Sequence, residues 1–132
     1  MALIQDLLYV CPSTPLQYAA LSALDLPQTY YSEMTDLYLK KRDYIVNALR
    51  TMGLKVTMPQ GAYYLLADFS ALNFNNDIEA ANFLIEEAKV ATVTGRSFYE
   101  NPDDGKNILR ICFAMNEDKL TKAIQQLQKA LG

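Results

Sequence analysis

The sequence predicts an α+β fold in which helices cover one face of a small, mainly antiparallel or mixed β-sheet. Three observations predict it. Helix and strand patterns follow one another in the order α-α-β-β-α-β-β-α, hydrophobic residues make up 51% of the chain and charged residues 20%, and the length of 132 residues suits one domain. Paired strands alternating with amphipathic helices are typical of an α+β sandwich, and this composition is typical of globular proteins. We therefore expect a single domain over residues 1–132.

Two helices are expected before the first strand. Thr14 followed by Pro15 is typical of an N-cap with proline at the first helical position, and Pro27 ends this helix. Ser32 can cap a second, longer helix, and Gly53 supplies its stop. In both helices the apolar residues recur with a period of 3.6. They are Leu16, Ala19, Ala20, Ala23 and Leu24 in the first, and Met34, Leu37, Tyr38, Ile45, Ala48, Leu49 and Met52 in the second.

Two strand pairs and two further helices follow. The first pair covers residues 55–58 and 62–69, and the second of these runs is apolar on both faces, which indicates a central strand. Asn76 and Glu79 have capping-box spacing ahead of a third helix. Asn116 caps the last helix, which follows the second strand pair. The apolar stripes are Ile78, Ala81, Leu84, Ile85 and Ala88 in the third helix, and Leu120, Ala123, Ile124, Leu127 and Leu131 in the last.

The final strand carries one cation, Arg110, within an otherwise apolar run. The period of 2 places Ile108, Arg110, Cys112 and Ala114 on one face of the strand, and Leu109, Ile111 and Phe113 on the other. We expect the larger trio to face the helices. In one interpretation Arg110 is an ordinary solvent-facing residue. In the other, a further domain covers its face, and its planar guanidinium points into a cleft and binds a carboxylate.

The composition argues against several classes of function. The net charge of −3 is unfavourable for a nucleic-acid surface, which needs a basic face. No apolar run approaches the roughly 20 residues of a membrane span. The chain lacks histidine and any cysteine cluster, so no metal site is expected. Cys11 and Cys112 lie in apolar surroundings, and we expect small core residues in a reducing, cytoplasmic compartment.

Several segments resemble the C-terminal (small) domain of class I/II, fold-type-I aminotransferases that use pyridoxal 5'-phosphate (PLP). They are residues 95–98 (Gly-Arg-Ser-Phe), 108–114 (Ile-Leu-Arg-Ile-Cys-Phe-Ala), 59–64 (Pro-Gln-Gly-Ala-Tyr-Tyr) and 11–17 (Cys-Pro-Ser-Thr-Pro-Leu-Gln). The resemblance extends from about residue 9 to residue 131 and is strongest to the kynurenine/methionine aminotransferase type. It implies that the chain is the C-terminal part of a larger aminotransferase, with residues 1–12 as the tail of an upstream interdomain helix.

The resemblance also implies roles for individual residues. Arg110 matches the arginine that binds the α-carboxylate of the substrate, and Gly95, Tyr63 and Tyr64 are candidates for lining the cleft. None of the eight lysines lies in the family's Ser-Lys context. The Schiff-base lysine, and with it the PLP site, is therefore expected in a missing N-terminal domain of a homodimeric parent. No catalytic residue is expected in this chain, which alone should be inactive and should not bind PLP.

Other interpretations stay open at this stage. Gly95 can be a simple turn residue, Tyr63 and Tyr64 can belong to a plain turn and core strand, and Arg96 is expected to be a solvated loop cation. The chain can also be the effector-sensing module of a transcription regulator with an aminotransferase-like fold. A third alternative is a stand-alone α+β interaction module, which would have a polar outer sheet face. The apolar residues 3–10 argue against that alternative.

Overall fold

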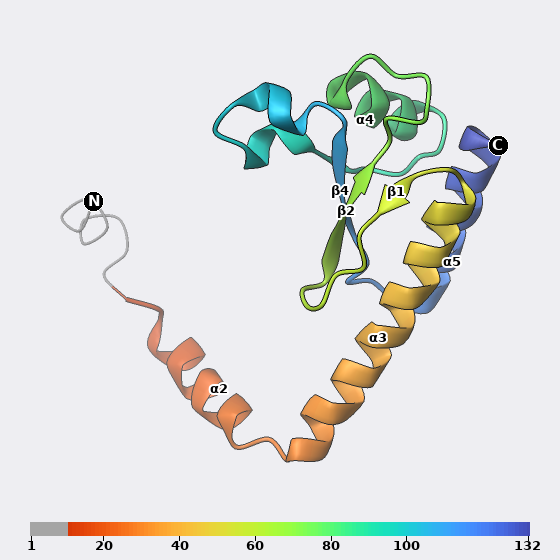
Figure 1. Ribbon diagram of the computed structural model, residues 1–132. Coiled ribbons are helices and arrows are strands. Elements are labelled where there is room, and N and C mark those ends of the chain that lie inside the picture. Colours follow the sequence, from red (N-terminus) through yellow and green to blue (C-terminus); the bar gives the residue numbers. More distant parts are fainter. Residues whose placement is uncertain (1–10) are drawn as a thin grey trace. The chain divides into compact units, whose positions relative to one another are not determined.

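The structure is a computed structural model that describes residues 11–132 (Figure 1). The predicted helix tail over residues 1–12 therefore lies almost wholly outside the described residues. The chain divides into two compact units, Met1–Thr35 and Asp36–Gly132. None of the helices in the described part is long and apolar enough to cross a membrane.

The first unit contains helix α2 (Thr14–Leu24) and the beginning of helix α3 (Gln28–Thr51). Ser13 is the N-cap of α2, one residue before the predicted cap, and Pro15 lies in the first turn as expected. The prediction that Ser32 caps α3 is wrong. The helix already begins at Gln28, and the Ser32 hydroxyl donates to the Gln28 carbonyl at 3.1 Å within the helix. A serine that bonds back to the preceding turn is compatible with a helix interior.

The second unit contains a four-stranded antiparallel sheet with the strand order β1-β2-β4-β3 (Figure 1). Its strands are β1 (Lys55–Val56), β2 (Tyr64–Asp68), β3 (Val93–Thr94) and β4 (Ile108–Cys112). The prediction of a central strand is confirmed, because β2 pairs with both β1 and β4. This strand begins at Tyr64 rather than at residue 62, since Ala62 has a φ of 66° and so cannot extend the ladder.

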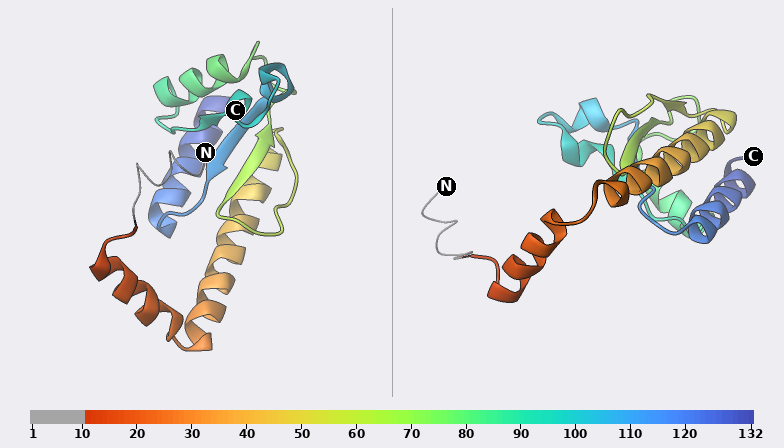
Figure 2. Two further views of the ribbon diagram at one scale, coloured as in Figure 1. Left: turned by 90° about the vertical axis from the view of Figure 1, so that its left-hand side faces the viewer. Right: turned by 90° about the horizontal axis from the view of Figure 1, so that it is seen from below.

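The core of the second unit lies between the helices and one face of this sheet, as the sequence predicts (Figure 2). Along β4 the predicted alternation is confirmed: Leu109, Ile111 and Phe113 are buried, and the residues between them are more exposed. The helices that contribute to the core are α3, α4 (Asp77–Glu86) and α5 (Glu117–Leu131). Their buried apolar residues are Ile45, Val46, Ala48 and Leu49 from α3, Ala80, Ala81 and Leu84 from α4, and Leu120, Ile124 and Leu127 from α5.

Asparagine side chains begin two of these helices, as predicted. The Asn76 side chain accepts hydrogen bonds from the backbone N–H groups of Ile78 and Glu79. The Asn116 side chain accepts one from Lys119. Each cap satisfies backbone donors that a helix N-terminus would otherwise leave without partners.

The prediction that both cysteines belong to the core is wrong. Cys11 and Cys112 are exposed free thiols. Cys112 occupies the last position of β4 on the face that points away from the helices, so the same alternation that buries its neighbours leaves it exposed.

Phe113→Ala tests how strongly the sheet depends on its packing against α3. The Phe113 side chain is 1% exposed, and its ring lies 6.3 Å from the ring of Tyr38. We expect its truncation to lower the free energy of unfolding by about 3–5 kcal/mol, because it leaves a cavity in the core. Cys112→Ala at the neighbouring exposed position should stay within about 0.5 kcal/mol of wild type. Urea titration measures both, and equal effects of the two changes would contradict this account.

Candidate functional site

Arg110 lies at the centre of β4 on the sheet face opposite the helical core. It is paired in register with Leu66 on β2 and with Val93 on β3, so two strands flank it. Both neighbours are partly open to solvent, at 40% and 37% exposed. Strand pairing therefore fixes the backbone of Arg110, and the neighbouring side chains leave this face of the sheet partly open.

Two aromatic rings hold the Arg110 guanidinium. Its central carbon lies 5.1 Å from the ring centroid of Tyr64 on β2 and 5.1 Å from that of Phe98. Phe98 ends the short 3-10 helix η1 (Gly95–Phe98), which directly follows β3. Cation–π contacts of this kind stabilise by about 0.5–2 kcal/mol each, depending on how far they are desolvated. The guanidinium is thus in contact with one ring from β2 and one from η1.

The guanidinium of Arg110 has donors left to offer. Its Nε–H is buried and has no hydrogen-bond partner among the described residues, and neither of the two ion pairs found in residues 11–132 involves it. A buried donor without an acceptor destabilises by about 1–3 kcal/mol. A carboxylate matches the fork of a guanidinium with two parallel hydrogen bonds, and neither Nη group of Arg110 takes part in an ion pair among the described residues.

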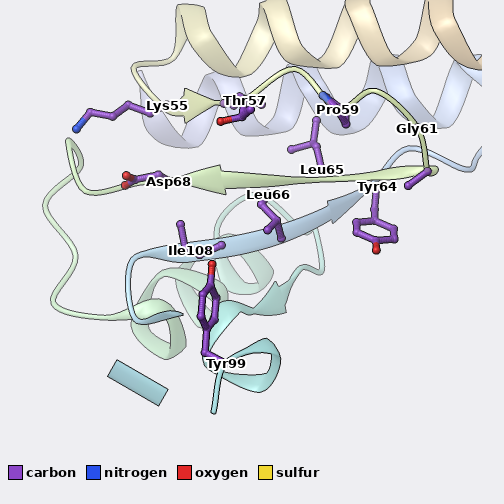
Figure 3. A pocket seen from close by; sticks show the side chains of 12 residues that line it. Lys55, Thr57, Pro59, Gly61, Tyr64, Leu65, Leu66, Asp68, Tyr99 and Ile108 are labelled. Carbon is purple, nitrogen blue, oxygen red and sulfur yellow. The ribbon is translucent and has the colours of Figure 1, made fainter. Parts of the chain in front are cut away.

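An open groove of about 660 Å³ runs over the same face of the sheet, across β1, β2 and β4 (Figure 3). Its walls are largely apolar and aromatic, with Tyr64, Leu66, Tyr99 and Ile108 on one side of the view, and Lys55 and Asp68 at one end. Arg110 is not itself a lining residue. Two residues connect the groove to Arg110, because both line the groove. Tyr64 contacts the guanidinium with its ring, and Leu66 is the register partner of Arg110 on β2. The groove volume falls within the range typical of small-molecule sites.

The other residues expected at the cleft have different positions. Tyr64 lines the groove, whereas Tyr63 is 56% exposed and packs its ring edge-on against Tyr64 at 5.6 Å. Gly95 is buried, and a Cβ at this position would clash with the carbonyl oxygens of Gly105 and Ile108. Glycine is therefore required there because two backbone segments approach closely, and contact of Gly95 or Tyr63 with a ligand stays a prediction.

Arg96 is not the solvated loop cation that the sequence suggests. Its Nε and Nη2 donate to Asp77 Oδ1 at 2.8 and 2.5 Å, and its backbone N–H donates to Asp77 Oδ2 at 3.1 Å. The Asp77 side chain is fully buried at the start of α4. This ion pair ties η1 to α4.

The sequence does indicate that Asp77 is buried and needs a partner, but the predicted apolar stripe of this helix missed it because the stripe was placed on the wrong residues. The buried face of α4 consists of Asp77, Ala80, Ala81 and Leu84, at the spacing i, i+3, i+4 and i+7. The predicted stripe included Ile78 and Ile85, which are 45% and 47% exposed. With the stripe shifted by one residue, a carboxylate falls on the buried face, where it requires a cation or hydrogen-bond donors.

The environment of Asp77 changes its acidity. Burial acts to raise the pKa of Asp77, but the hydrogen bonds and the positive charge of Arg96 lower it more strongly. The pKa of Asp77 consequently lies below its ordinary value of 3.8. The same contact raises the pKa of Arg96.

Comparison with known proteins assigns the chain to a family. Residues 1–127 match the model of the family described as aminotransferase class I and II. The chain is 36% identical to a probable aspartate/prephenate aminotransferase of Aquifex aeolicus, over 90% of this chain, and 34% identical to a methionine aminotransferase of Escherichia coli, over 89%. The chain therefore belongs to the class I/II aminotransferases, a PLP-dependent family.

Solved structures agree with this assignment. An alanine aminotransferase from Pyrococcus furiosus superimposes with a TM-score of 0.80 at 31% identity over 92% of this chain. The methionine aminotransferase structure from Escherichia coli gives a TM-score of 0.80 at 32% identity over 94%. The predicted α+β fold with its small antiparallel sheet is thus confirmed. This chain spans about 30% of the length of either sequence relative, and 30% and 32% of the two solved chains.

Two lysines of the described part already have hydrogen-bond partners within the fold. The buried lysine, Lys41, donates to the Met115 carbonyl at 2.6 Å, and the lysine at the groove, Lys55, donates to Ser70 at 3.3 Å. The N-termini of α4 and α5 carry acidic residues in their first turns, which disfavour a phosphate group there.

The lowered pKa of Asp77 predicts an acid-sensitive contribution to stability. Because the folded pKa lies below the ordinary value of 3.8, this contribution is fully present above that pH and is lost as the pH falls below it. Asp77→Asn should therefore lower the melting temperature at pH 6. The difference between wild type and variant should shrink once the pH falls below 3.8. Thermal unfolding between pH 6 and pH 2.5 measures this, and a pH-independent difference would contradict it.

Proposed function

We propose that this chain is the C-terminal, small domain of an aminotransferase that moves an amino group from an amino acid to a 2-oxo acid, and that Arg110 binds the substrate α-carboxylate. The observation that carries the proposal is the Arg110 guanidinium, which lies between Tyr64 and Phe98 and has a buried Nε–H without an acceptor among the described residues. Family membership supports the same role.

The chemistry of this site suits an anchoring role rather than a reacting one. A guanidinium keeps its charge at any physiological pH and offers a carboxylate two parallel hydrogen bonds. Contacts with two rings limit the freedom of the guanidinium, which would favour a defined orientation of the bound carboxylate. The apolar surface of Leu66 and Tyr64 extends from the site into the groove. Amino acids with apolar side chains fit such a surface better than amino acids with two carboxylates.

The remaining parts of the enzyme are assigned to protein outside this chain. We propose that an N-terminal domain supplies the lysine and the PLP site, that the parent is a cytoplasmic homodimer, and that residues 1–12 join the two domains. When bound, PLP supplies the electron sink for amino-group transfer. This chain binds and orients the substrate carboxylate.

The outer face of the sheet favours this proposal over a stand-alone interaction module. Leu66, Val93, Phe98 and Tyr99 are between 37% and 47% exposed on or beside this face. A self-sufficient module would be expected to present polar residues there. Exposed apolar residues that gather in one region are typical of a ligand-binding or interaction surface.

Arg110→Ala in the complete protein tests the proposed role directly. Removal of one partner of a desolvated, hydrogen-bonded charge pair costs about 2–5 kcal/mol. We therefore expect kcat/KM to fall by about 30- to 4,000-fold for every amino acid tried. Arg110→Lys should restore only part of the activity, because an ammonium group cannot form the two parallel bonds. Lys122→Ala, which removes a cation from α5, should leave kcat/KM unchanged, and near-wild-type kinetics for Arg110→Ala would refute the assignment.

The isolated 132-residue chain should not transaminate. When the chain is mixed with PLP, methionine and a 2-oxo acid, we expect no amino transfer and no absorbance change typical of PLP bound to a lysine. The reason is that none of its lysines lies in the family's Ser-Lys context. The complete protein under the same conditions is the positive control. Stoichiometric PLP binding or turnover by the isolated chain would overturn this expectation.

A further inference from the structure

Two residues of the 3-10 helix η1 link Arg110 to a buried ion pair. Arg96 binds Asp77 of α4, and Phe98, two residues later, lies over the Arg110 guanidinium. We propose that the Asp77–Arg96 pair positions η1, so that Phe98 holds Arg110 in the orientation that binds a carboxylate. Asp77 and Arg96 would thus be positioning residues that act on the ligand through Phe98 and Arg110. The inference rests on the proposed function of Arg110.

The first argument is that Asp77 holds the backbone of η1 as well as a side chain. One carboxylate oxygen accepts hydrogen bonds from Nε and Nη2 of Arg96, and the other accepts the Arg96 backbone N–H at 3.1 Å. A contact with side-chain atoms alone would leave the turn free to move. The backbone bond instead fixes the main chain two residues before Phe98.

The second argument is that the start of η1 is also fixed by close packing. A Cβ on Gly95 would clash with the Gly105 carbonyl oxygen and would lie 2.5 Å from the Ile108 carbonyl oxygen. Gly105 ends the second 3-10 helix, η2 (Pro102–Gly105), and Ile108 begins β4, the strand that carries Arg110. The turn is therefore held between α4 on one side and the beginning of β4 on the other.

The third argument concerns Phe98 itself. Its side chain is 47% exposed, so core packing does not fix the position of the ring. The backbone of η1 is then the main determinant of where the ring lies. A loosened turn would release Phe98 from Arg110 and give the guanidinium more freedom.

The geometry of α4 keeps the Asp77 carboxylate available for this task. The Asn76 side chain caps the helix by accepting the N–H groups of Ile78 and Glu79. Asp77 is consequently not needed as the cap and points to Arg96. Its position at the helix N-terminus favours the charged form, since the helix dipole is positive there.

A double-mutant cycle in the complete protein tests the inference. Arg96→Ala and Phe98→Leu are made singly and together, and KM and kcat are measured with methionine as donor and pyruvate as acceptor. Each single change should raise the KM for methionine by about three- to tenfold, the range expected for one lost cation–π contact, with kcat within twofold of wild type. The double variant should show no larger KM than Phe98→Leu alone, because both changes release the same ring.

Three variants separate positioning from stability. Phe98→Tyr keeps an aromatic ring and should recover most of the affinity that Phe98→Leu loses. Leu127→Ala removes a buried side chain of α5 and should lower the melting temperature without a change in KM. If Arg96→Ala does not fold, Arg96→Lys replaces it, since lysine keeps the charge but loses the planar fork that binds Asp77. Calorimetric titration of pyruvate into each variant supplies an affinity that does not depend on turnover.

The outcomes distinguish this inference from the proposed function. An unchanged KM and pyruvate affinity in Arg110→Ala would overturn the proposed function and with it the inference. If Arg110→Ala weakens binding while Arg96→Ala changes only the melting temperature, the positioning role alone is overturned. Additive effects of Arg96→Ala and Phe98→Leu on KM would likewise overturn a role exerted through the ring. Non-additive effects with preserved kcat support it.

Discussion

The alternation of side chains along β4 is the constraint on which both the core and the candidate site depend. Leu109, Ile111 and Phe113 are each at most 5% exposed and join the sheet to the helices. A strand that buries these three residues must direct Arg110 to the opposite face. Burial of these three apolar side chains therefore determines on which face of the sheet Arg110 lies, although the core itself is on the other face. A slip of one residue in register would exchange the two faces and bury the cation in the core.

Among the described residues, Arg110 has two aromatic neighbours and no ion pair with a carboxylate. An intramolecular ion pair would occupy the donors that the proposed carboxylate ligand would need. Ring faces attract the positive charge without accepting its N–H groups in the plane of the guanidinium. Tyr64 and Phe98 thus stabilise the cation and leave its hydrogen-bonding edge available. Arg96, two residues before Phe98, shows the opposite arrangement. Its guanidinium donates to the Asp77 carboxylate of the same chain, so each group has a partner of opposite charge.

Local chemistry made much of this fold predictable. The asparagine caps at residues 76 and 116 depend only on residues next to them in the sequence, and the order of the elements follows from such local patterns. The two faces of β4 follow from a period of 2, which the sequence displays directly. Contacts between distant segments were not predictable in the same way. The Asp77–Arg96 pair joins residues 19 positions apart, and it emerges only when the apolar stripe of α4 is placed one residue earlier. Ala81 and Leu84 belong to both placements, so the pattern did not decide between them.

The candidate site is shared among three segments whose positions relative to one another are set by the antiparallel register. β2 contributes Tyr64, η1 contributes Phe98 and β4 contributes Arg110. The pairing of Leu66 with Arg110 fixes β2 against β4. The pairing of Val93 with Arg110 fixes β3 against β4, and it brings η1 close to Arg110 because η1 directly follows β3. Since β3 has only two residues, ladder hydrogen bonds alone hold η1 weakly. The close approach of Gly95 to Gly105 and the bonds from Arg96 to Asp77 supply the remaining restraint. The proposed precision of the arginine site would therefore depend on groups that do not contact the guanidinium, namely the Asp77–Arg96 pair and the backbone at Gly95.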